Sequence, residues 1–567
     1  MTDSLKKTAT KIVNIYTLLL MVVFPLFMTD SYYNIQQSKL YFYLYSTILA
    51  TVLVVLCVLY GKVTGKWEDG TAVAANAGKA ADKAAANAAG KHEEAAKEPL
   101  WKRFCAAMRP GDWFALLFAG AVVLSTVCSE WKYEAFWGNM GRNQGCFILL
   151  WYVVTYFLIS RFYKVRKWHI DLFVAAGLVV CVWGVLDCYW KSPLGWQILH
   201  EHGNEKAFDF SSTFGNVNVL TAAEGMYLMA ASAMFIGERK PVRSVFYYVA
   251  ACAAFMGLVC GCSDNALISV AAAICFLPFF AFGSMEGIVR YAALLPGYFA
   301  SMLLAGRIGH MEGQRVVIRW KWGELLVWSM EKPDSVRLAF IAALLLFGVL
   351  AVVYMVYRRK SAGTAAADNV NGGTQWKAAK PLRTLWALLG VLAACALIWV
   401  FYDANHGGHP ELYAPYRKIL ILNDAWGTHR GYNWSLAMKY FRDFPLIKKL
   451  VGSGPETYGI FTHVYDHYAM IEMFQETYDS PHNEWLQYLF TTGILGFVGY
   501  YGMVKCALWN GFGIGKKKNT DEKWLCGAAM CYALMAYSLQ SFVNISIPVI
   551  VPMVIMVIGV CASIDRE

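Results

Sequence analysis

The chain has 567 residues, of which 58% are hydrophobic and only 16% are charged, and its formal net charge is +11 at pH 7. A typical soluble protein is roughly 25% charged, so this composition excludes an ordinary soluble domain and indicates an integral membrane protein. The positive charge does not indicate nucleic-acid binding, because Lys and Arg gather in short segments between long apolar runs and no nucleic-acid-binding motif is present.

Long apolar runs follow one another along the chain and predict about fourteen transmembrane helices at the usual span of ~20 residues. Their expected ranges are 12–28, 40–61, 112–128, 146–160, 169–190, 219–237, 244–260, 264–282, 287–305, 338–357, 384–402, 484–505, 524–541 and 546–562. Each run must form a helix, because lipid cannot satisfy backbone polar groups and the runs lack the alternating pattern of a barrel strand. The sequence therefore predicts an all-α fold, a polytopic transmembrane helical bundle.

The basic segments between the spans predict the orientation of the bundle. With both termini in the cytoplasm, most Lys and Arg residues fall on the cytoplasmic side, as the positive-inside rule requires. The expected order is N-terminal transmembrane helices (1–61), a cytoplasmic linker (62–111), a central transmembrane core (112–357), a second cytoplasmic linker (358–383), one transmembrane helix (384–402), an extracytoplasmic loop (403–483) and C-terminal transmembrane helices (484–567). The Ala-rich composition of the first linker favours an exposed helix or a disordered tether.

The long extracytoplasmic loop is expected to hold the chemistry, because a loop of this length in a protein with little other soluble mass is usually functional. It contains six of the chain's 11 His, namely His406, His409, His429, His463, His467 and His482. Most of the 15 Cys lie inside apolar runs, and no Cys or His spacing typical of a zinc or redox site is present. We therefore expect neither a metal nor another cofactor.

Five polar, glycine-containing stretches lie in the outer segments or at the outer membrane edge: 137–145, 211–218, 307–319, 428–454 and 478–496. The string from His482 to Gly496 resembles the signature of the O-antigen ligase and Wzy polymerase-like superfamily, in which a His precedes a Leu-rich helix and a Gly-x-x-Gly. Other motifs of that superfamily are matched in the right order by Gly141-Arg142, Gly215-Asn-Val-Asn218, and the stretches 430–434, 443–445 and 452–454. One departure is Ser263-Asp-Asn-Ala266, where many members have an Arg after the Ser.

The resemblance implies a membrane glycosyltransferase of the C-type helical class. Such an enzyme takes a glycan from an undecaprenyl-pyrophosphate carrier and passes it to a hydroxyl of a lipid, glycan or protein acceptor. The reaction takes place at the outer face of the cytoplasmic membrane, without a nucleotide sugar, a metal or another cofactor. The partners implied are thus the lipid-linked donor, the acceptor and membrane lipids, and the choice between ligase and polymerase stays open.

Two other classes of function compete with this interpretation. A multi-pass transporter or flippase of lipid-linked glycans would have a similar number of helices, but it would predict inverted repeats and broken helices at the midplane. No convincing repeat is present, and the distinctive residues cluster in the outer segments. A non-catalytic membrane scaffold or sensor that uses loop 403–483 as a binding module is the third possibility.

The chemistry of the implied reaction points to particular basic residues. A pyrophosphate leaving group needs positive charge, and Arg supplies it through a bidentate fork. Arg430 is the candidate with a catalytic role, and the candidates for substrate binding are Arg142, Arg307, Arg315 and Arg319. The alternatives are that Arg142 reaches lipid headgroups and that 307–319 is a basic face against anionic lipid.

His482 is the candidate general base, because a His near neutral pKa is the commonest proton acceptor for a hydroxyl. Asp479 or Glu484 could orient its ring, and the competing interpretation is a structural His that binds a carbonyl at the helix start. Asn216 and Asn218 are further candidates for substrate binding, with helix capping as the alternative.

Overall fold

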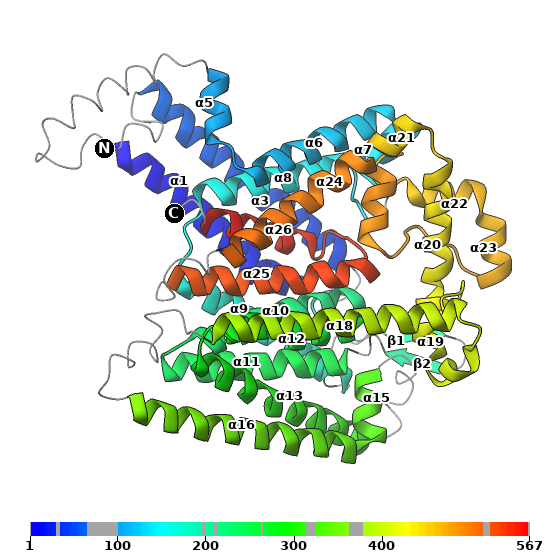
Figure 1. Ribbon diagram of the computed structural model, residues 1–567. Helices are drawn as coiled ribbons and strands as arrows, with labels where there is room; N and C mark the ends of the chain where they lie inside the picture. Colours follow the sequence, from blue (N-terminus) through cyan, green and yellow to red (C-terminus); the bar gives the residue numbers. More distant parts are fainter. Residues whose placement is uncertain are drawn as a thin grey trace, which may run out of the picture.

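A computed structural model describes residues 2–29, 34–64, 100–139, 141–189, 191, 193–194, 199–202, 205–208, 212–261, 263, 265–312, 324–361, 378–513 and 522–564. Long helices dominate this part of the chain and run side by side in one bundle (Figure 1). The Ala-rich stretch 72–96 and most of 361–380 lie outside the described residues.

Each of the predicted spans overlaps one helical segment. These are α1 (Thr2–Leu18) with its continuations η1 (Leu19–Val23) and α2 (Phe24–Leu26), α3 (Ile35–Val63), α6 (Pro110–Cys128), α8 (Cys146–Phe162), α9 (Lys167–Cys188), α10 (Val217–Gly237), α11 (Pro241–Cys260), α12 (Asn265–Ala281), α13 (Met285–Glu312), α16 (Pro333–Ser361), α18 (Ala379–His406), α24 (Glu484–Gly513), α25 (Glu522–Gln540) and α26 (Val551–Ile564). Within the described residues, ten helices are long and apolar enough to cross a membrane, and three shorter ones are also apolar. The predicted polytopic helical membrane fold is therefore confirmed, while the number of spans stays a prediction.

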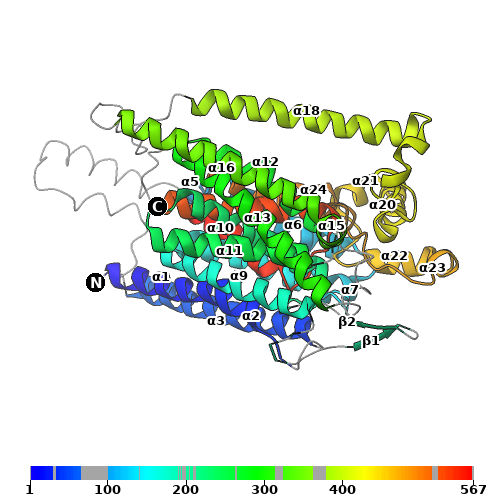
Figure 2. The same ribbon diagram turned by 90° about the horizontal axis from the view of Figure 1, so that it is seen from below.

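The core of the bundle lies around α10 and α25, whose membrane-spanning stretches are almost wholly buried. Small residues allow this close packing, since a Cβ atom on Gly225 would lie 2.2 Å from the Ser269 hydroxyl. By contrast, α16 and α18 are almost wholly exposed within the chain and lie at one edge of the bundle (Figure 2). Their exposed Leu and Val side chains suit contact with lipid.

Lys39 on α3 is fully buried, although a charged side chain inside a membrane bundle is costly. Its ammonium donates to the carbonyl oxygens of Phe24 and Pro25 at 2.6 and 2.9 Å. These carbonyls lie at the end of α2, where the last carbonyl groups of a helix lack their usual helical partners; the Phe24 carbonyl also accepts from Phe27 N at 3.3 Å. Lys39 therefore closes the end of the first membrane helix.

The bundle has two unlike ends. The first helix begins and the last helix ends at one of them, while α20–α23 lie at the other (Figures 1 and 2). The chain termini and the helices of loop 403–483 thus lie at opposite ends of the bundle, and their placement on opposite sides of the membrane stays a prediction. Which side is the cytoplasm stays a prediction.

The predicted loop 403–483 is largely helical, and α18 continues four residues into it, to His406. It then contains η4 (Pro410–Tyr416), α19 (Arg417–Leu420), α20 (Trp426–Asp443), α21 (Leu446–Val451), α22 (Tyr458–Tyr465) and α23 (His467–Phe474). These helices enclose a second hydrophobic core formed by Leu436, Ala437, Tyr440, Phe444, Tyr458, Phe461, Met470 and Phe490. Because Phe490 belongs to α24, this small helical unit is seated directly on the C-terminal membrane helices.

Shorter elements complete the described part of the chain. They are α5 (Leu100–Ala107), α7 (Lys132–Trp137), α15 (Glu324–Glu331), η6 (Ser541–Val543) and the strands β1 (Leu199–His202) and β2 (Glu205–Phe208). The two strands form an antiparallel hairpin in which Leu199 pairs with Phe208. This hairpin was not expected from the sequence, but it leaves the all-α class unchanged.

A sharp break divides α24 at Gly493, whose φ is +67°. The turn after α21 lies against this break: Ser453 N donates to Phe490 O at 3.1 Å and Gly454 N to Thr491 O at 3.0 Å. A Cβ atom on Gly452 would come within 2.2 Å of the Thr491 carbonyl oxygen, so the turn needs glycine. The break therefore fixes the position of the segment that follows, 453–457.

Candidate active site

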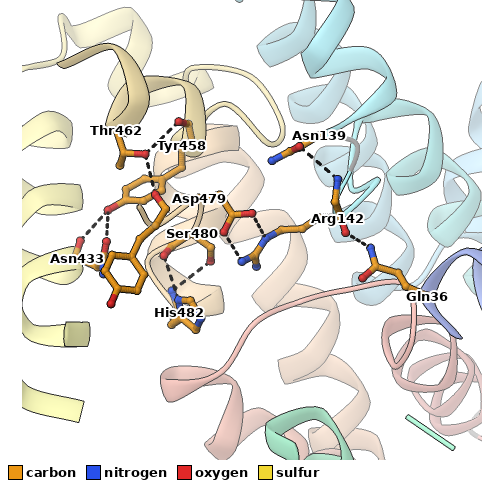
Figure 3. A network of polar contacts seen from close by, with 12 residues as sticks. Gln36, Asn139, Arg142, Asn433, Tyr458, Thr462, Asp479, Ser480 and His482 are labelled. Carbon is orange, nitrogen blue, oxygen red and sulfur yellow. Dashed lines mark hydrogen bonds and ion pairs between the residues drawn. The ribbon is translucent and has the colours of Figure 1, made fainter. Parts of the chain in front are cut away.

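Arg142 lies in the loop between α7 and α8 and forms a bidentate ion pair with Asp479 (Figure 3). Its Nε and Nη2 atoms donate to the two carboxylate oxygens at 2.8 and 2.5 Å. Burial alone would raise the pKa of the Asp479 carboxyl, but the hydrogen bonds and the charge of Arg142 hold it below its ordinary value. Arg142 is thus a partly buried, oriented cation at the loop end of the bundle.

His482 lies three residues after Asp479, in the same short segment between α23 and α24. Its Nδ1 is 3.2 Å from the carbonyl oxygen of Ser480, and its backbone N donates to the Ser480 hydroxyl. Since a carbonyl oxygen can only accept, Nδ1 carries the proton and Nε2 presents a lone pair. The ring therefore has the tautomer that a proton acceptor needs.

The surroundings of His482 keep its ring uncharged. Burial, followed by the positive charges of Arg142 and Arg430, lowers the pKa of His482 to about 4, although the Ser480 carbonyl and Asp479 act in the opposite direction. The two arginines from different parts of the chain thus act on one imidazole. The backbone of His482 is also unusual, with φ at +51°, a left-handed conformation that costs about 1–3 kcal/mol and is common at functional sites.

Arg430 is presented by a left-handed turn at the start of α20. Gly427, Thr428 and His429 have φ values of +60°, +58° and +64°, and Arg430 is the first residue after them. Its Nη1 donates to the Gly427 carbonyl oxygen at 3.0 Å, so the side chain folds back over this turn. The guanidinium is half-buried and lies close enough to His482 for its charge to matter.

The segment that carries Asp479 and His482 is held by the loop helices. Trp434 Nε1 donates to the Pro481 carbonyl oxygen at 3.0 Å, and the Thr462 hydroxyl donates to the Tyr478 carbonyl oxygen at 2.7 Å. The side chain of Asn483 accepts a hydrogen bond from Leu486 N and caps α24. The helix cap is therefore Asn483, which leaves the His482 ring available for another role.

The two carboxylates suggested as partners of His482 have other partners. Asp479 is engaged by Arg142, and it acts on His482 only through its charge. Glu484 is fully buried, and its Oε2 accepts a hydrogen bond from the Tyr537 hydroxyl at 2.7 Å. The carbonyl of Ser480 is the group that orients the ring.

Glu456 is a further site residue that sequence reasoning missed. It is buried, its φ is +60°, and it follows the Gly452–Gly454 turn that lies against the break in α24. Burial raises the pKa of its carboxyl to about 7, with Asp479 adding to the effect and the charge of Arg142 opposing it. The only sequence signal was its position directly after Gly-Ser-Gly-Pro, because the residue that follows a tight turn has a defined position.

Glu456 lines a small cavity of about 20 Å³, which is room for about one water molecule. Other polar groups of the lining are Gln144, Gln487, Tyr488 and Ser546. In the part of the chain that the structure describes, the Gln144 amide, Gln487 Oε1 and the Ser546 hydroxyl have no hydrogen-bond partner. Buried polar groups are nearly always paired, so this concentration marks a place that suits a polar molecule.

The remaining candidates lie elsewhere. Asn216 caps α10 by accepting from the backbone N of Asn218 and Val219, and Asn218 accepts from the Ser263 hydroxyl at 2.6 Å. Arg307 is an exposed residue inside α13, which extends past the expected end of its span to Glu312. Three further positions fall outside the described residues: Asp264, Arg315 and Arg319.

Residues 334–501 match the family model described as O-antigen ligase. This match confirms the resemblance to the O-antigen ligase and Wzy polymerase-like superfamily. No curated protein matches the chain. The protein is accordingly a polytopic helical membrane protein whose residues 334–501 are similar to the O-antigen ligase family.

The O-antigen ligase match runs from α16 into α24 and includes Arg430, Glu456, Asp479 and His482. Arg142 lies far upstream of the matched segment, so the site combines residues from inside and outside it. Among the described residues, no group of three or more His, Cys, Asp or Glu side chains has an arrangement that would hold a metal ion.

Proposed function

We propose that this protein transfers a glycan from an undecaprenyl-pyrophosphate carrier to a hydroxyl of a lipid, glycan or protein acceptor, at the outer face of the cytoplasmic membrane. The observation that carries the proposal is the meeting of Arg142, Arg430 and His482 at the loop end of the bundle, two of them inside the O-antigen ligase match. A neutral imidazole that is within reach of the charges of two guanidinium groups suits a reaction that removes a proton and releases pyrophosphate.

In this mechanism the acceptor hydroxyl oxygen attacks the anomeric carbon of the donor sugar. The bond from that carbon to the pyrophosphate oxygen breaks, and its electron pair stays with the pyrophosphate. Nε2 of His482 takes the hydroxyl proton as the new glycosidic bond forms. Arg142 and Arg430 stabilise the negative charge that develops on the leaving group.

Asp479 controls how Arg142 meets the donor. It occupies Nε and Nη2 of the guanidinium, while Nη1 is not part of the ion pair. The donor pyrophosphate either binds through Nη1 or displaces the carboxylate. In both cases Asp479 keeps the guanidinium in a fixed orientation until the donor arrives, which reduces the entropy lost on binding.

The decisive experiment is substitution of His482 with Asn, which tolerates the left-handed backbone of this position and cannot act as a base. Turnover of purified lipid-linked donor should fall about a hundredfold or more, with donor binding unchanged. His463→Ala, at an exposed position of α22, is the matched control and should keep normal turnover. Turnover of His482→Asn within a few-fold of wild type would show that the base lies elsewhere or is not needed.

A further inference from the structure

A groove of about 640 Å³ lies between α3 and the segment that follows α2. Its volume is within the range of about 300–1,000 Å³ that is usual for ligand pockets. Phe27 and Thr29 form one wall, and the face of α3 from Asn34 to Leu49 forms the other. At 1.5 Å per residue, this face is ~22 Å long, a large part of the depth of a bilayer.

The polarity of the groove changes along its length. Its beginning is lined by polar groups, with Asn34 just before α3 and Gln37 and Ser38 in the first turn of the helix. Further along the helix the lining is mainly aromatic and aliphatic, with Tyr45 and Leu49 exposed on the surface. A polar start followed by an apolar run matches a molecule with a charged head and a long hydrocarbon chain.

The polar end of the groove is close to the candidate active site. Gln36, also in the first turn of α3, donates from Nε2 to the carbonyl oxygen of Gly141, the residue before Arg142 (Figure 3). Gln37, the next residue in the chain, lines the groove. The loop that presents Arg142 to Asp479 is therefore attached to the helix that carries the groove.

We propose that this groove binds the first isoprene units of the polyisoprenyl chain of the donor, with the pyrophosphate at the end near Arg142. The inference rests on the proposed function, and it adds the side from which the donor reaches the site: along α3, from the lipid that faces the first two membrane helices. Aromatic residues also gather at membrane interfaces without binding a particular lipid, so the experiments must separate these two cases.

The first experiment fills the groove at its apolar end. Leu49→Trp should raise KM for a donor with a long polyisoprenyl chain about tenfold, with little change in kcat and no change in KM for a donor with a ten-carbon chain. The matched control is Leu56→Trp, two helical turns further on, where the side chain is similarly exposed (56% against 60%) but does not line the groove. Equal KM values for Leu49→Trp and Leu56→Trp with the long-chain donor would overturn the proposal.

The second experiment does not depend on transfer. A photo-crosslinking residue at position 45 should label a radioactive polyisoprenyl pyrophosphate that carries no glycan, and the same residue at position 56 should not. Excess unlabelled polyisoprenyl pyrophosphate should abolish the labelling, whereas excess phospholipid should not. Equal competition by phospholipid would identify an ordinary lipid-facing surface. Labelling without any glycan transfer by the wild-type protein would refute the proposed function, but the groove would still be assigned to the polyisoprenyl chain.

Discussion

Arg142 and Asp479 form a bidentate ion pair although 337 positions separate them in the chain. The pair joins the loop before α8 to the segment before α24, and His482 lies beside it. Because Arg142 lies outside the segment matched by the O-antigen ligase model and Asp479 inside it, the site exists only when both parts of the bundle are packed together.

The first prediction concerns the bidentate hydrogen bonding of the Arg142 guanidinium. In Arg142→Lys, the single ammonium cannot occupy both oxygens of Asp479 or present a planar pair of donors to pyrophosphate. We expect KM for the lipid-linked donor to rise about tenfold or more, which is about 1.4 kcal/mol, and kcat to fall as well. Steady-state kinetics with purified donor would measure both.

The control for this substitution is Arg442→Lys, at an exposed position 3.7 Å from the carboxylate of the neighbouring Asp443. It should leave both constants unchanged. If Arg142→Lys behaves like Arg442→Lys, Arg142 is a structural residue and the pyrophosphate is bound by other groups.

The second prediction is the pH dependence of catalysis. A His482 with a pKa of about 4 is already neutral well below pH 7, so kcat/KM should rise through about pH 4 and then stay level to neutral pH. A requirement for ionised Glu456 would instead give a rise near pH 7. The profile of kcat/KM, together with that of Glu456→Gln, distinguishes the two groups: a rise near pH 7 that disappears in Glu456→Gln would make the carboxylate the base.

The third prediction is the pH dependence of stability. The folded state raises the pKa of Glu456, so the stability that this group contributes is present below about pH 4.5 and is lost as the pH rises to about 7. Glu456→Gln should remove this loss, so its melting temperature in detergent should change less between pH 4.5 and 7 than that of wild type.

Asp479→Asn provides a comparison of opposite sign. The folded state lowers the pKa of Asp479, so its contribution to stability is present above the ordinary pKa of Asp and is lost as the pH falls below it. The melting temperature of this variant should therefore be less sensitive than wild type to acid below about pH 4. If both variants follow wild type over the full range, neither carboxyl is perturbed by folding.

The fourth prediction is transfer without a metal ion. The positive charge at the site comes from Arg142 and Arg430, so glycan transfer should persist in an excess of chelator. Transfer that stops completely in chelator and returns only on addition of magnesium or manganese would show that a metal ion takes part.

The fifth prediction concerns the side of the membrane on which the site lies. In a background without the exposed Cys128, Cys275 and Cys395, a membrane-impermeant thiol reagent should label His409→Cys on intact cells. Lys79→Cys should react only after the membrane is opened. The reverse pattern would place the loop helices in the cytoplasm.

The positions of the membrane helices could be predicted from sequence because lipid imposes a simple requirement, a long apolar run, that each segment meets by itself. His482 and Arg430 could be proposed as site residues for a similar reason, because each belongs to a local motif, and their roles stay predictions. Lys39 shows the limit of this reasoning: it precedes the expected span 40–61, and only the packing of α3 against the end of α2 buries it.

The pairings within the site could not be predicted in the same way. Asp479 was a plausible partner for the nearby His482, but its carboxylate lies against an arginine from a distant loop. The burial of Glu456 could not be predicted from its neighbours in the sequence. It results from the way in which the preceding turn packs on α24 and next to α8. Such contacts depend on the tertiary arrangement and leave no periodic signal in the chain.

The contact between Gly452 and Gly493 restricts how this protein can vary. A Cβ atom on either glycine would lie 2.5–2.6 Å from the backbone nitrogen of the other, and each also meets a carbonyl oxygen at 2.2–2.3 Å. Because the obstacles are main-chain atoms, no smaller side chain nearby could make room for a substitution. A suppressor screen that starts from Ala at either position should therefore return only true revertants, and a random library should tolerate neither change.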